Sequence, residues 1–443
     1  MKKTIKLAVV AALALGATSA FATNGDVMIG QGAKSRAMGG VGIAKAFGAE
    51  SALANPANIS SVKDMEATLA VTVFMPSVSF NSNAAANAQN GSTNPVAVQS
   101  ADSASNLSVI PEIYYAARLS DKLVLGLAIA GTAGMGVDYD GTAFGTQTDN
   151  GSFRMKTALS LLKVAVPVSY TIDGFTFGIE GVMQYGSLAL SHMRQTPTGF
   201  SLLENGASTD IGYGLEAGLT YTTGGLTLGA VYKSKIGMTY DNTISASVNA
   251  FGGAAFTGIG SGDNLDQPEE KGVGISYAMG ENTISADYKN IAWGDAAGYK
   301  DFGWENQDVY SVGYEYAAKS WAFRAGYNYA KSPIIEQDGN PMTAGNAAYG
   351  NSVKNFFNLA GFPGVVETHY TLGGGINLGD FTIDGAVIYV PEVIVSSNTT
   401  GMTAGFQANA TQPANPANWD GSTSTADVTH SQVGVTIAGT YRF

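Results

Sequence analysis

The chain has 443 residues, a formal net charge of −12 and no cysteine. Without cysteine it can form neither a disulfide framework nor a thiolate-based metal or redox site. The acidic balance and the lack of a basic cluster argue against nucleic-acid binding. A composition of 57 Gly and 21 Tyr with only 13% charged residues favours an all-β chain, and no linker divides it into domains.

The first residues have the pattern of a secretory signal peptide. Lys2 and Lys3 give a positive start, residues 7–15 form a short apolar core, and residues 20–22 read Ala-Phe-Ala, a cleavage site. The alternative, a membrane anchor, is disfavoured because the run is shorter than the ~20 residues that a membrane helix needs. We therefore predict that residues 1–22 are removed on export.

From about residue 66 onward the hydropathy alternates with a period of two, which predicts strands. At the C-terminus the odd positions of 433–443 are apolar or Gly, whereas Thr436, Thr440 and Arg442 share the other face. A soluble sandwich would bury the apolar face, and an outer-membrane barrel would turn it to lipid. Export and aromatic residues near the strand ends favour the barrel.

The lengths of the connections favour it further. We expect fourteen strands, near 66–80, 106–119, 122–133, 155–171, 174–192, 209–222, 225–240, 268–279, 282–294, 306–317, 320–331, 365–377, 380–395 and 430–443. Tight turns alternate with long connections at 81–105, 134–154, 193–208, 241–267, 295–305, 332–364 and 396–429. Short periplasmic turns, longer outer loops and an even strand number are typical of a transmembrane barrel. The fold prediction is a 14-stranded antiparallel transmembrane β-barrel over residues 63–443, with both its ends on the periplasmic side.

The segment before the first strand is small, apolar and nearly uncharged. A fourteen-strand lumen is too wide for its own side chains to fill, so we predict that residues 23–62 form a plug, or hatch, inside it. Asn55 and Pro56 have the pattern of a helix start. A loose periplasmic arm is the alternative, but disordered tails are usually charged and poor in apolar residues.

Residues 24–60 carry Gly32, Lys34-Ser35-Arg36, Met38-Gly39-Gly40, Gly42 and Asn55-Pro56-Ala57 in that order. This ordered set resembles the N-terminal hatch of the FadL-type outer-membrane channels, which take up long-chain fatty acids and, in some branches, aromatic hydrocarbons. The resemblance implies a hatch that includes Gly39, Gly40, Asn55, Pro56 and Ala57. It also implies capture of ligand by outer loops, a lumen site near the hatch, and sideways exit at an inward kink of the third strand.

The third predicted strand can form such a kink, because it carries Gly131, Gly134 and Gly136, and Gly inside a strand favours bulges. Pro111 in the second strand and Pro167 in the fourth, expected at similar heights, lack the N–H needed for the ladder. These five residues predict a lateral opening. The alternative is that isolated Pro and Gly residues are tolerated at ordinary bulges.

Candidate ligand contacts lie in the long connections, which hold more apolar residues than is usual for solvent-exposed loops. The candidates are Phe200, Leu202, Leu203, Phe251, Phe256, Phe356, Phe357 and Phe362. Packing of loop against loop is the alternative for each. We expect most lumen charges to form ion pairs, and we name Lys233 and Arg324 as residues that could meet a fatty carboxylate.

The sequence thus predicts a monomeric channel in the outer membrane of a Gram-negative bacterium, for passive uptake of hydrophobic molecules, foremost long-chain fatty acids. Aromatic hydrocarbons are the alternative ligand, and a surface adhesin or an outer-membrane hydrolase is less favoured, since His192, His369 and His430 are isolated. No cofactor or metal is expected. The terminal Phe443 resembles the signal read by the outer-membrane assembly machinery, although an ordinary apolar strand end would look the same.

Overall fold

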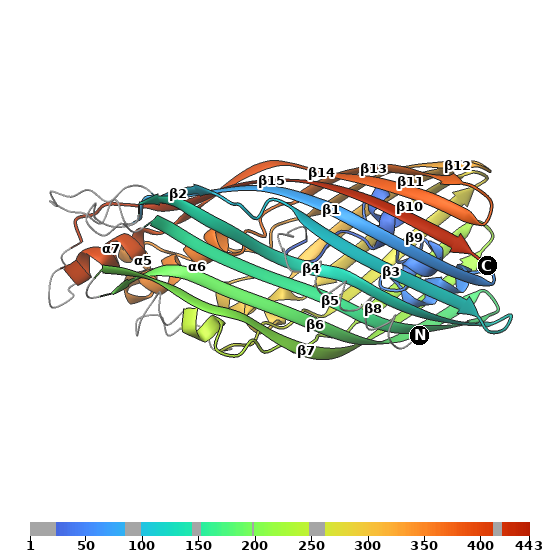
Figure 1. Ribbon diagram of the computed structural model, residues 1–443, viewed down its shortest axis with the longest axis horizontal. Coiled ribbons are helices and arrows are strands. Elements are labelled where there is room, and N and C mark those ends of the chain that lie inside the picture. The colour runs from blue at the N-terminus through green and yellow to red at the C-terminus, as the bar shows by residue number, and fades with distance from the viewer. Residues whose placement is uncertain (1–23, 85–98, 144–151, 197–198, 248–261, 411–418) are drawn as a thin grey trace.

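The computed structural model describes residues 24–84, 99–143, 152–196, 199–247, 262–410 and 419–443. In these residues fifteen strands form one antiparallel sheet that closes on itself through pairing of β15 with β1 (Figure 1). The strands are β1 (Met65–Ser82), β2 (Gln99–Asp102), β3 (Ser108–Arg118), β4 (Leu123–Ala143), β5 (Ser152–Ile172), β6 (Phe175–Thr196), β7 (Gly199–Thr223), β8 (Leu226–Lys233), β9 (Glu270–Met279), β10 (Asn282–Ile291), β11 (Gln307–Ala317), β12 (Trp321–Ala330), β13 (Thr368–Asn377), β14 (Phe381–Asn398) and β15 (Thr425–Arg442).

Fourteen of these strands make the barrel, as predicted, and the four-residue β2 pairs with the far end of β1. The barrel closes with Glu66 opposite Arg442, so it begins and ends at the same end. That end also carries the tight turns, and we call it the turn end. The opposite end is the loop end. None of the helices in the described residues is long and apolar enough to cross a membrane.

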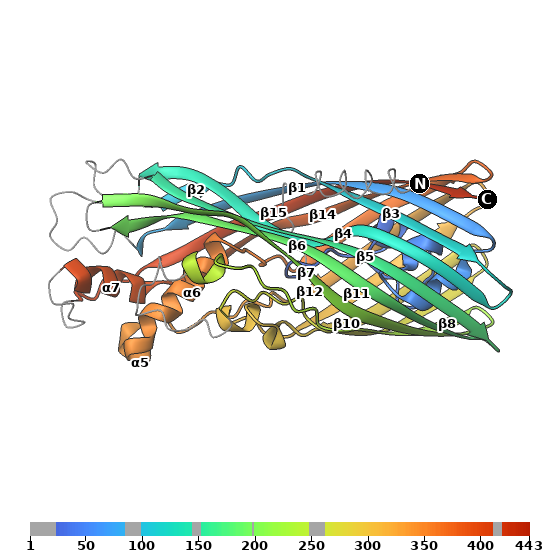
Figure 2. The same ribbon diagram turned by 60° about the horizontal axis from the view of Figure 1, so that its bottom comes forward.

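The strands are unequal in length. Each of β4–β7 has 21 or more residues, whereas each of β8–β13 has 8–11. Figure 2 shows β5–β7 running the length of the molecule and helices α5 (Pro341–Ala344), α6 (Ala348–Ala360) and α7 (Thr400–Ala410) lying beyond the shorter strands. We call the side formed by β4–β7 the tall side of the barrel and the side formed by β8–β13 the low side. The connections at the loop end of the low side have room to fold inward. They also carry η4 (Trp293–Asp295), η5 (Tyr299–Phe302) and η6 (Gly345–Ala347).

Two predicted connections are corrected by the structure. Residues 193–196 and 199–208 are not a loop, because β6 and β7 pair up to Thr196 opposite Gly199. In the same way β4 and β5 extend into 134–154. Conversely, β8 ends at Lys233 and not near residue 240. The strict alternation of short and long connections therefore fails on the tall side of the barrel.

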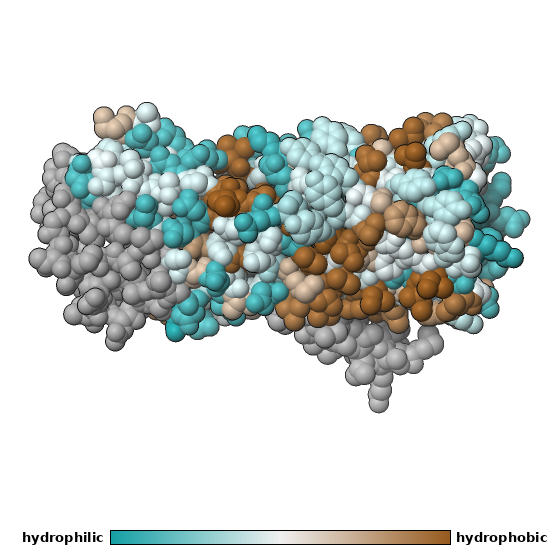
Figure 3. Space-filling view, turned by 90° about the horizontal axis from the view of Figure 1, so that it is seen from above, coloured by the Kyte–Doolittle hydropathy of each residue, from teal (hydrophilic) through white to brown (hydrophobic). Residues whose placement is uncertain are grey.

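The outer surface is apolar at membrane height. Side chains that face outward include Leu69, Ile275, Leu372 and Ile437, each about half exposed or more, and they alternate with buried residues along their strands. On the face seen in Figure 3 the apolar surface lies mainly on the half of the barrel nearer the turn end, and the rim of that end is hydrophilic. The sheet thus has the two-faced pattern that the sequence predicts.

Candidate functional site: two cavities and a break in the barrel wall

Residues 24–62, which we call the luminal segment, lie inside the barrel. They include α2 (Gly32–Ala37), η1 (Gly48–Ser51) and η2 (Pro56–Ser61). α2 contacts β12–β15, η1 contacts β1 and β3, and η2 contacts β4–β7, so the segment touches strands on several sides of the lumen. Asn55 caps η2 as predicted: its side chain accepts a hydrogen bond from the Ala57 N–H at 3.0 Å.

Glycines in the barrel wall let this segment approach the strands. A Cβ at Gly178 would lie 2.1 Å from the Ala57 nitrogen, and one at Gly218 would lie 1.8 Å from Asn55 Oδ1. Gly39 itself has a positive φ of 70°, and a Cβ there would meet the backbone of Tyr327 at 2.6 Å. Part of the high glycine content therefore serves the contact between lumen and wall.

Buried charges fasten the segment to the wall. Arg36 forms an ion pair with Glu112 of β3, with both side chains fully buried, and donates to Thr72 of β1 at 2.8 Å. Towards the turn end, Lys34 pairs with Glu50 at 2.8 Å and approaches Asp384 of β14 at 3.7 Å. Removing one partner of such a pair would leave a buried charge uncompensated.

The barrel wall has a break between β3 and β4. Their pairing ends at Glu112 opposite Ala130, and β3 runs on along β1 alone. Beyond that point β4 pairs instead with the luminal segment: Met28 N–H donates to the Thr132 carbonyl at 3.2 Å, and Gly134 N–H donates to the Asp26 carbonyl at 3.0 Å. We call the interval between β3 and β4 from Gly131 to Gly136 the wall break.

The proline positions agree only in part with the predicted opening. Pro111 is the first residue of β3 beyond the last pair with β4, as expected. Pro167, however, is not at this height. The register of β4 and β5 places it beside Gly126, and a Cβ on Gly126 would lie 2.9 Å from its Cγ. Past Ala130 the β4–β5 pairing continues, with a bulge between Gly131 and Ala133.

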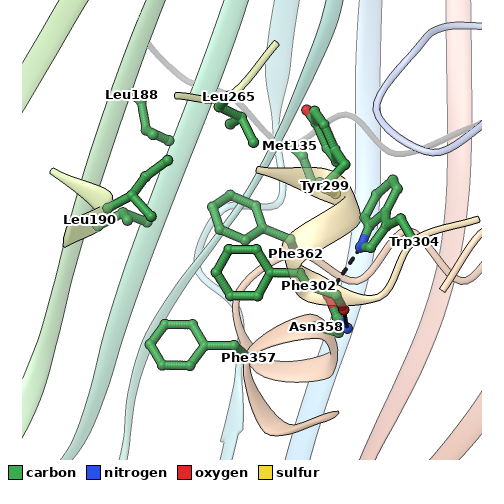
Figure 4. Close-up of a pocket in the computed structure, with 11 residues that line it drawn as sticks. Met135, Leu188, Leu190, Leu265, Tyr299, Phe302, Trp304, Phe357, Asn358 and Phe362 are labelled. Carbon is green, nitrogen blue, oxygen red and sulfur yellow. Dashed lines mark hydrogen bonds between the residues drawn. The ribbon is translucent and has the colours of Figure 1, made fainter. Parts of the chain in front are cut away.

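An apolar cavity lies in the lumen on the loop-end side (Figure 4). We call it the aromatic cavity. Phe302 and Phe357 face each other in its wall at 6.3 Å between ring centroids, and Trp304 is fixed by a 3.0 Å hydrogen bond from Nε1 to Asn358 Oδ1. The remaining lining residues are Met135, Leu188, Leu190, Ile244, Leu265, Tyr299 and Phe362.

A second cavity adjoins the luminal segment, and we call it the polar cavity. Lys163 and Lys233 line it together with Glu270. Lys163 Nζ pairs with Glu216 at 3.0 Å, and Lys233 Nζ pairs with Glu270 at 3.1 Å. Thr132 and Ala133 of β4 also line it, so the polar cavity reaches the wall break.

Asp26 stands between the two cavities. Its carboxyl accepts hydrogen bonds from Tyr299 of the aromatic cavity and, at 3.0 Å, from Gln267 of the polar cavity. Burial raises the pKa of Asp26 to about 6, against the lowering effect of these hydrogen bonds and of Lys163. Asp26 thus contacts both cavities through its carboxyl group and contacts β4 in the wall break through its backbone carbonyl.

A family model described as "Outer membrane protein transport protein (OMPP1/FadL/TodX)" matches residues 8–343. The chain belongs to this family. The expected resemblance to FadL-type channels is thereby confirmed, and so is the location in the outer membrane of a Gram-negative bacterium. The loop end is the outer end, and the turn end is the periplasmic end.

Solved FadL-family structures share the fold. A FadL homologue from Pseudomonas aeruginosa has a TM-score of 0.64 at 15% identity, with 95% of this chain and 100% of that chain covered. The toluene transporter TodX of Pseudomonas putida has 0.62 at 19%, with 95% and 100% covered. The toluene transporter TbuX of Ralstonia pickettii has 0.59 at 18%, with 94% and 99% covered.

One curated relative also matches. It is an uncharacterized protein from the 5′ region of the phosphoenolpyruvate carboxykinase gene of Chlorobium limicola, 39% identical over 85 residues. The match spans 19% of this chain and 42% of that protein.

Within this FadL-family barrel, the structure brings together only some of the predicted ligand contacts. Phe357 and Phe362 line the aromatic cavity. Phe356 does not: it is buried beside Phe80, at 5.2 Å between ring centroids. Phe200, Leu202 and Leu203 belong to strand β7 and not to a capture loop, and Phe251 and Phe256 fall outside the described residues.

The two basic residues predicted to meet a fatty carboxylate, Lys233 and Arg324, lie in different parts of the barrel. Lys233 lines the polar cavity and donates to the Leu53 carbonyl at 2.9 Å. Arg324 lies at the periplasmic end, where it is held between Glu315 and Asp384 at 2.7 Å each, away from either cavity. The structure therefore does not bring Arg324 together with Lys233 or with the residues that line the two cavities.

Sequence reasoning missed the connection between β10 and β11. It supplies Tyr299, Phe302 and Trp304 to the aromatic cavity. The signal that could have found it is the density of aromatic residues in 293–304, where Trp293, Tyr299, Phe302 and Trp304 occur within twelve positions. The described residues contain no cluster of three or more metal-ligating side chains.

Proposed function

We propose that the protein is a passive uptake channel for long-chain fatty acids. The observation that carries this proposal is that a lysine-lined polar cavity lies beside the aromatic cavity, linked to it through Asp26, and that residues of the wall break line both cavities. A fatty acid has an apolar chain for the first cavity and a carboxylate for the second. An ammonium has three donors, so Lys163 and Lys233 can meet a carboxylate while they keep their glutamate partners.

The proposed route ends in the membrane and not in the periplasm. The luminal segment acts as a hatch that closes the direct path, with residues 1–22 as the removed signal peptide and 63–443 as the barrel. Seven residue pairs separate the wall break from the periplasmic turn. At ~3.3 Å per residue and a tilt of about 40°, the wall break lies roughly 18 Å above the periplasmic end, within an apolar band about 25 Å tall.

Passage requires residues 24–28 to separate from β4, because they occupy the path between the polar cavity and the wall break. The driving force is the concentration gradient of the ligand. We propose that the chain acts as a monomer, that it is a channel and not an enzyme, and that Phe443 serves recognition by the assembly machinery.

Aromatic hydrocarbons are the second candidate ligand. The aromatic cavity supports them, since its lining is almost entirely apolar, and two of the structural relatives are toluene transporters. A hydrocarbon would leave Lys163 and Lys233 without a function in the route.

Uptake of labelled oleate and of labelled toluene should be measured in cells that lack their own fatty-acid channel and express this protein. The proposal expects oleate uptake above the empty vector. Uptake of toluene alone, with the barrel shown to be assembled, would replace the fatty-acid assignment by the second candidate, and uptake of neither would overturn both.

A further inference from the structure

The wall break is closed by side chains, although β3 and β4 do not pair there. Ile110 of β3 points into the lumen and is 1% exposed. It forms a small apolar cluster with Met28 of the luminal segment and Phe74 of β1. This cluster is separate from the large core that includes the aromatic cavity.

Gly131 of β4 faces this cluster across the wall break. A Cβ on Gly131 would lie 2.6 Å from Ile110 Cγ2, which is closer than real Cβ contacts. The side chain of Ile110 therefore fills the space that any larger residue at 131 would occupy. The two strands touch here through one isoleucine against one glycine, without ladder hydrogen bonds.

The polypeptide on both sides of this contact is held by the luminal segment. Glu112, two residues after Ile110, accepts from the Gly32 N–H at 2.8 Å and pairs with Arg36. On the other side, Thr132 and Gly134 are bonded to Met28 and Asp26. The backbone edges are thus fixed, and the free width between them depends on the side chains at the contact.

We propose that Ile110, seated against Gly131 and Met28, is the residue that sets the largest cross-section of ligand that leaves through the wall break. This inference rests on the proposed lateral exit of hydrophobic ligands. Ile110 contributes no hydrogen bond and no charge, so it selects by size alone. A slim alkyl chain passes when residues 24–28 separate from β4, and a bulky ring system is retarded by the isoleucine.

The test compares two probes in whole cells: oleate, and a fatty acid that carries a pyrene ring at its terminal carbon. Ile110→Ala should raise the uptake of the pyrene probe relative to oleate by roughly tenfold, the scale of discrimination that small changes of apolar volume produce. Gly131→Ala should lower the same ratio. The double variant Ile110→Ala/Gly131→Ala removes three carbon atoms from one side of the contact and adds one to the other, so its ratio should lie between that of Ile110→Ala and that of the parent chain.

Ile113→Ala is the matched control. Ile113 is on the same strand, opposite Ile129 of β4 in the paired stretch, and it lies on the other face of β3 from Ile110. It should leave the ratio unchanged. The amount of assembled barrel at the cell surface is measured for every variant, so that a folding defect scales both probes alike and does not alter the ratio.

Two failures are distinguishable. In the first, the parent chain takes up oleate while the ratio of pyrene-probe uptake to oleate uptake is the same in Ile110→Ala and Ile113→Ala. Ile110 is then a packing residue, and the proposal that it limits the size of the ligand is wrong. If the parent chain takes up neither probe, the proposed fatty-acid channel is wrong, and the proposed role of Ile110, which rests on it, is wrong as well.

Discussion

Phe356 and Phe357 are neighbours in α6 with different surroundings. Phe357 lines the aromatic cavity, and Phe356 packs on Phe80 outside it. Exchange of an aromatic ring for leucine keeps the apolar surface but loses ring contacts worth roughly 1 kcal/mol. Phe357→Leu should therefore weaken oleate binding about fivefold, whereas Phe356→Leu should leave it unchanged.

Binding can be measured on the purified protein by tryptophan fluorescence, because Trp304 lines the same cavity. An equal loss in both variants would mean that the fluorescence change reports the stability of α6 and not contact with the ligand.

Asp26 should make the attachment of residues 24–28 depend on pH. Its pKa is raised from 3.8 to about 6 by burial while the segment is attached, and it returns to its ordinary value when the segment is detached and hydrated. Between these two values the attached form binds more protons. Attachment is therefore strongest below about pH 4 and weakens by up to about 3 kcal/mol as the pH rises to 6.

Hydrogen exchange at the amides of Met28 and Gly134, corrected for the intrinsic pH effect, measures this attachment. The protection in the parent chain should fall from pH 4.5 to pH 7.5. In Asp26→Asn, which keeps an acceptor for Tyr299 without a charge, it should not fall. The same pH dependence in both proteins would show that another group is responsible.

At the scale of elements, α2 is joined to β3 by the ion pair of Arg36 and Glu112. Glu112→Gln leaves a fully buried guanidinium without its counter-charge, and we expect it to lower the free energy of unfolding by about 3–5 kcal/mol. The double variant Arg36→Gln/Glu112→Gln removes both charges and should lose less. Urea unfolding in detergent micelles measures both, and simple additivity of the two single effects would contradict the pairing.

The sequence is a good guide to the strands and a poor one to where they end. Tight turns such as Asp173-Gly174 locate the periplasmic ends, because the register follows from the turn. The last four residues of β6 and the first ten of β7 fall in the predicted loop 193–208, which carries Pro197, Gly199 and Gly206. They are strands because each pairs with the other, and single-sequence alternation does not reveal that partner.

The site was predictable where one short segment defines it. The helix start at Asn55 and Pro56 could be predicted because capping chemistry is a local feature. The aromatic cavity could not, because its lining comes from β4, β6 and at least three separate outer connections. Proximity of Phe302 to Phe357 follows from how those connections fold over the low side of the barrel.

At the scale of the whole molecule, the unequal strands create the compartment. The tall strands β4–β7 form one side of the outer half, and the connections above β8–β13 fold in and supply the aromatic side chains. The luminal segment lies in the lumen between this compartment and the turn end. The wall break is the interval in which the long strand β4 pairs with this segment in place of β3.

The central claim is that residues 24–28 must separate from β4 for ligand to pass, and a reversible disulfide tests it most directly. Val27 lies opposite Ala133 between the two hydrogen bonds of Met28 and Gly134. A pair in this position has a Cα separation of ~4.5 Å, which suits a disulfide, and the chain has no cysteine of its own. The control is Ser276→Cys/Ser285→Cys, at two wall residues whose hydroxyls are 2.8 Å apart.

Oleate uptake through Val27→Cys/Ala133→Cys should fall to the empty-vector level when the disulfide is formed and return on reduction, while the control pair transports at the parent rate in both states. Uptake at the parent rate with the Val27→Cys/Ala133→Cys disulfide fully formed would contradict the account, because the ligand would then pass without releasing the luminal segment from β4.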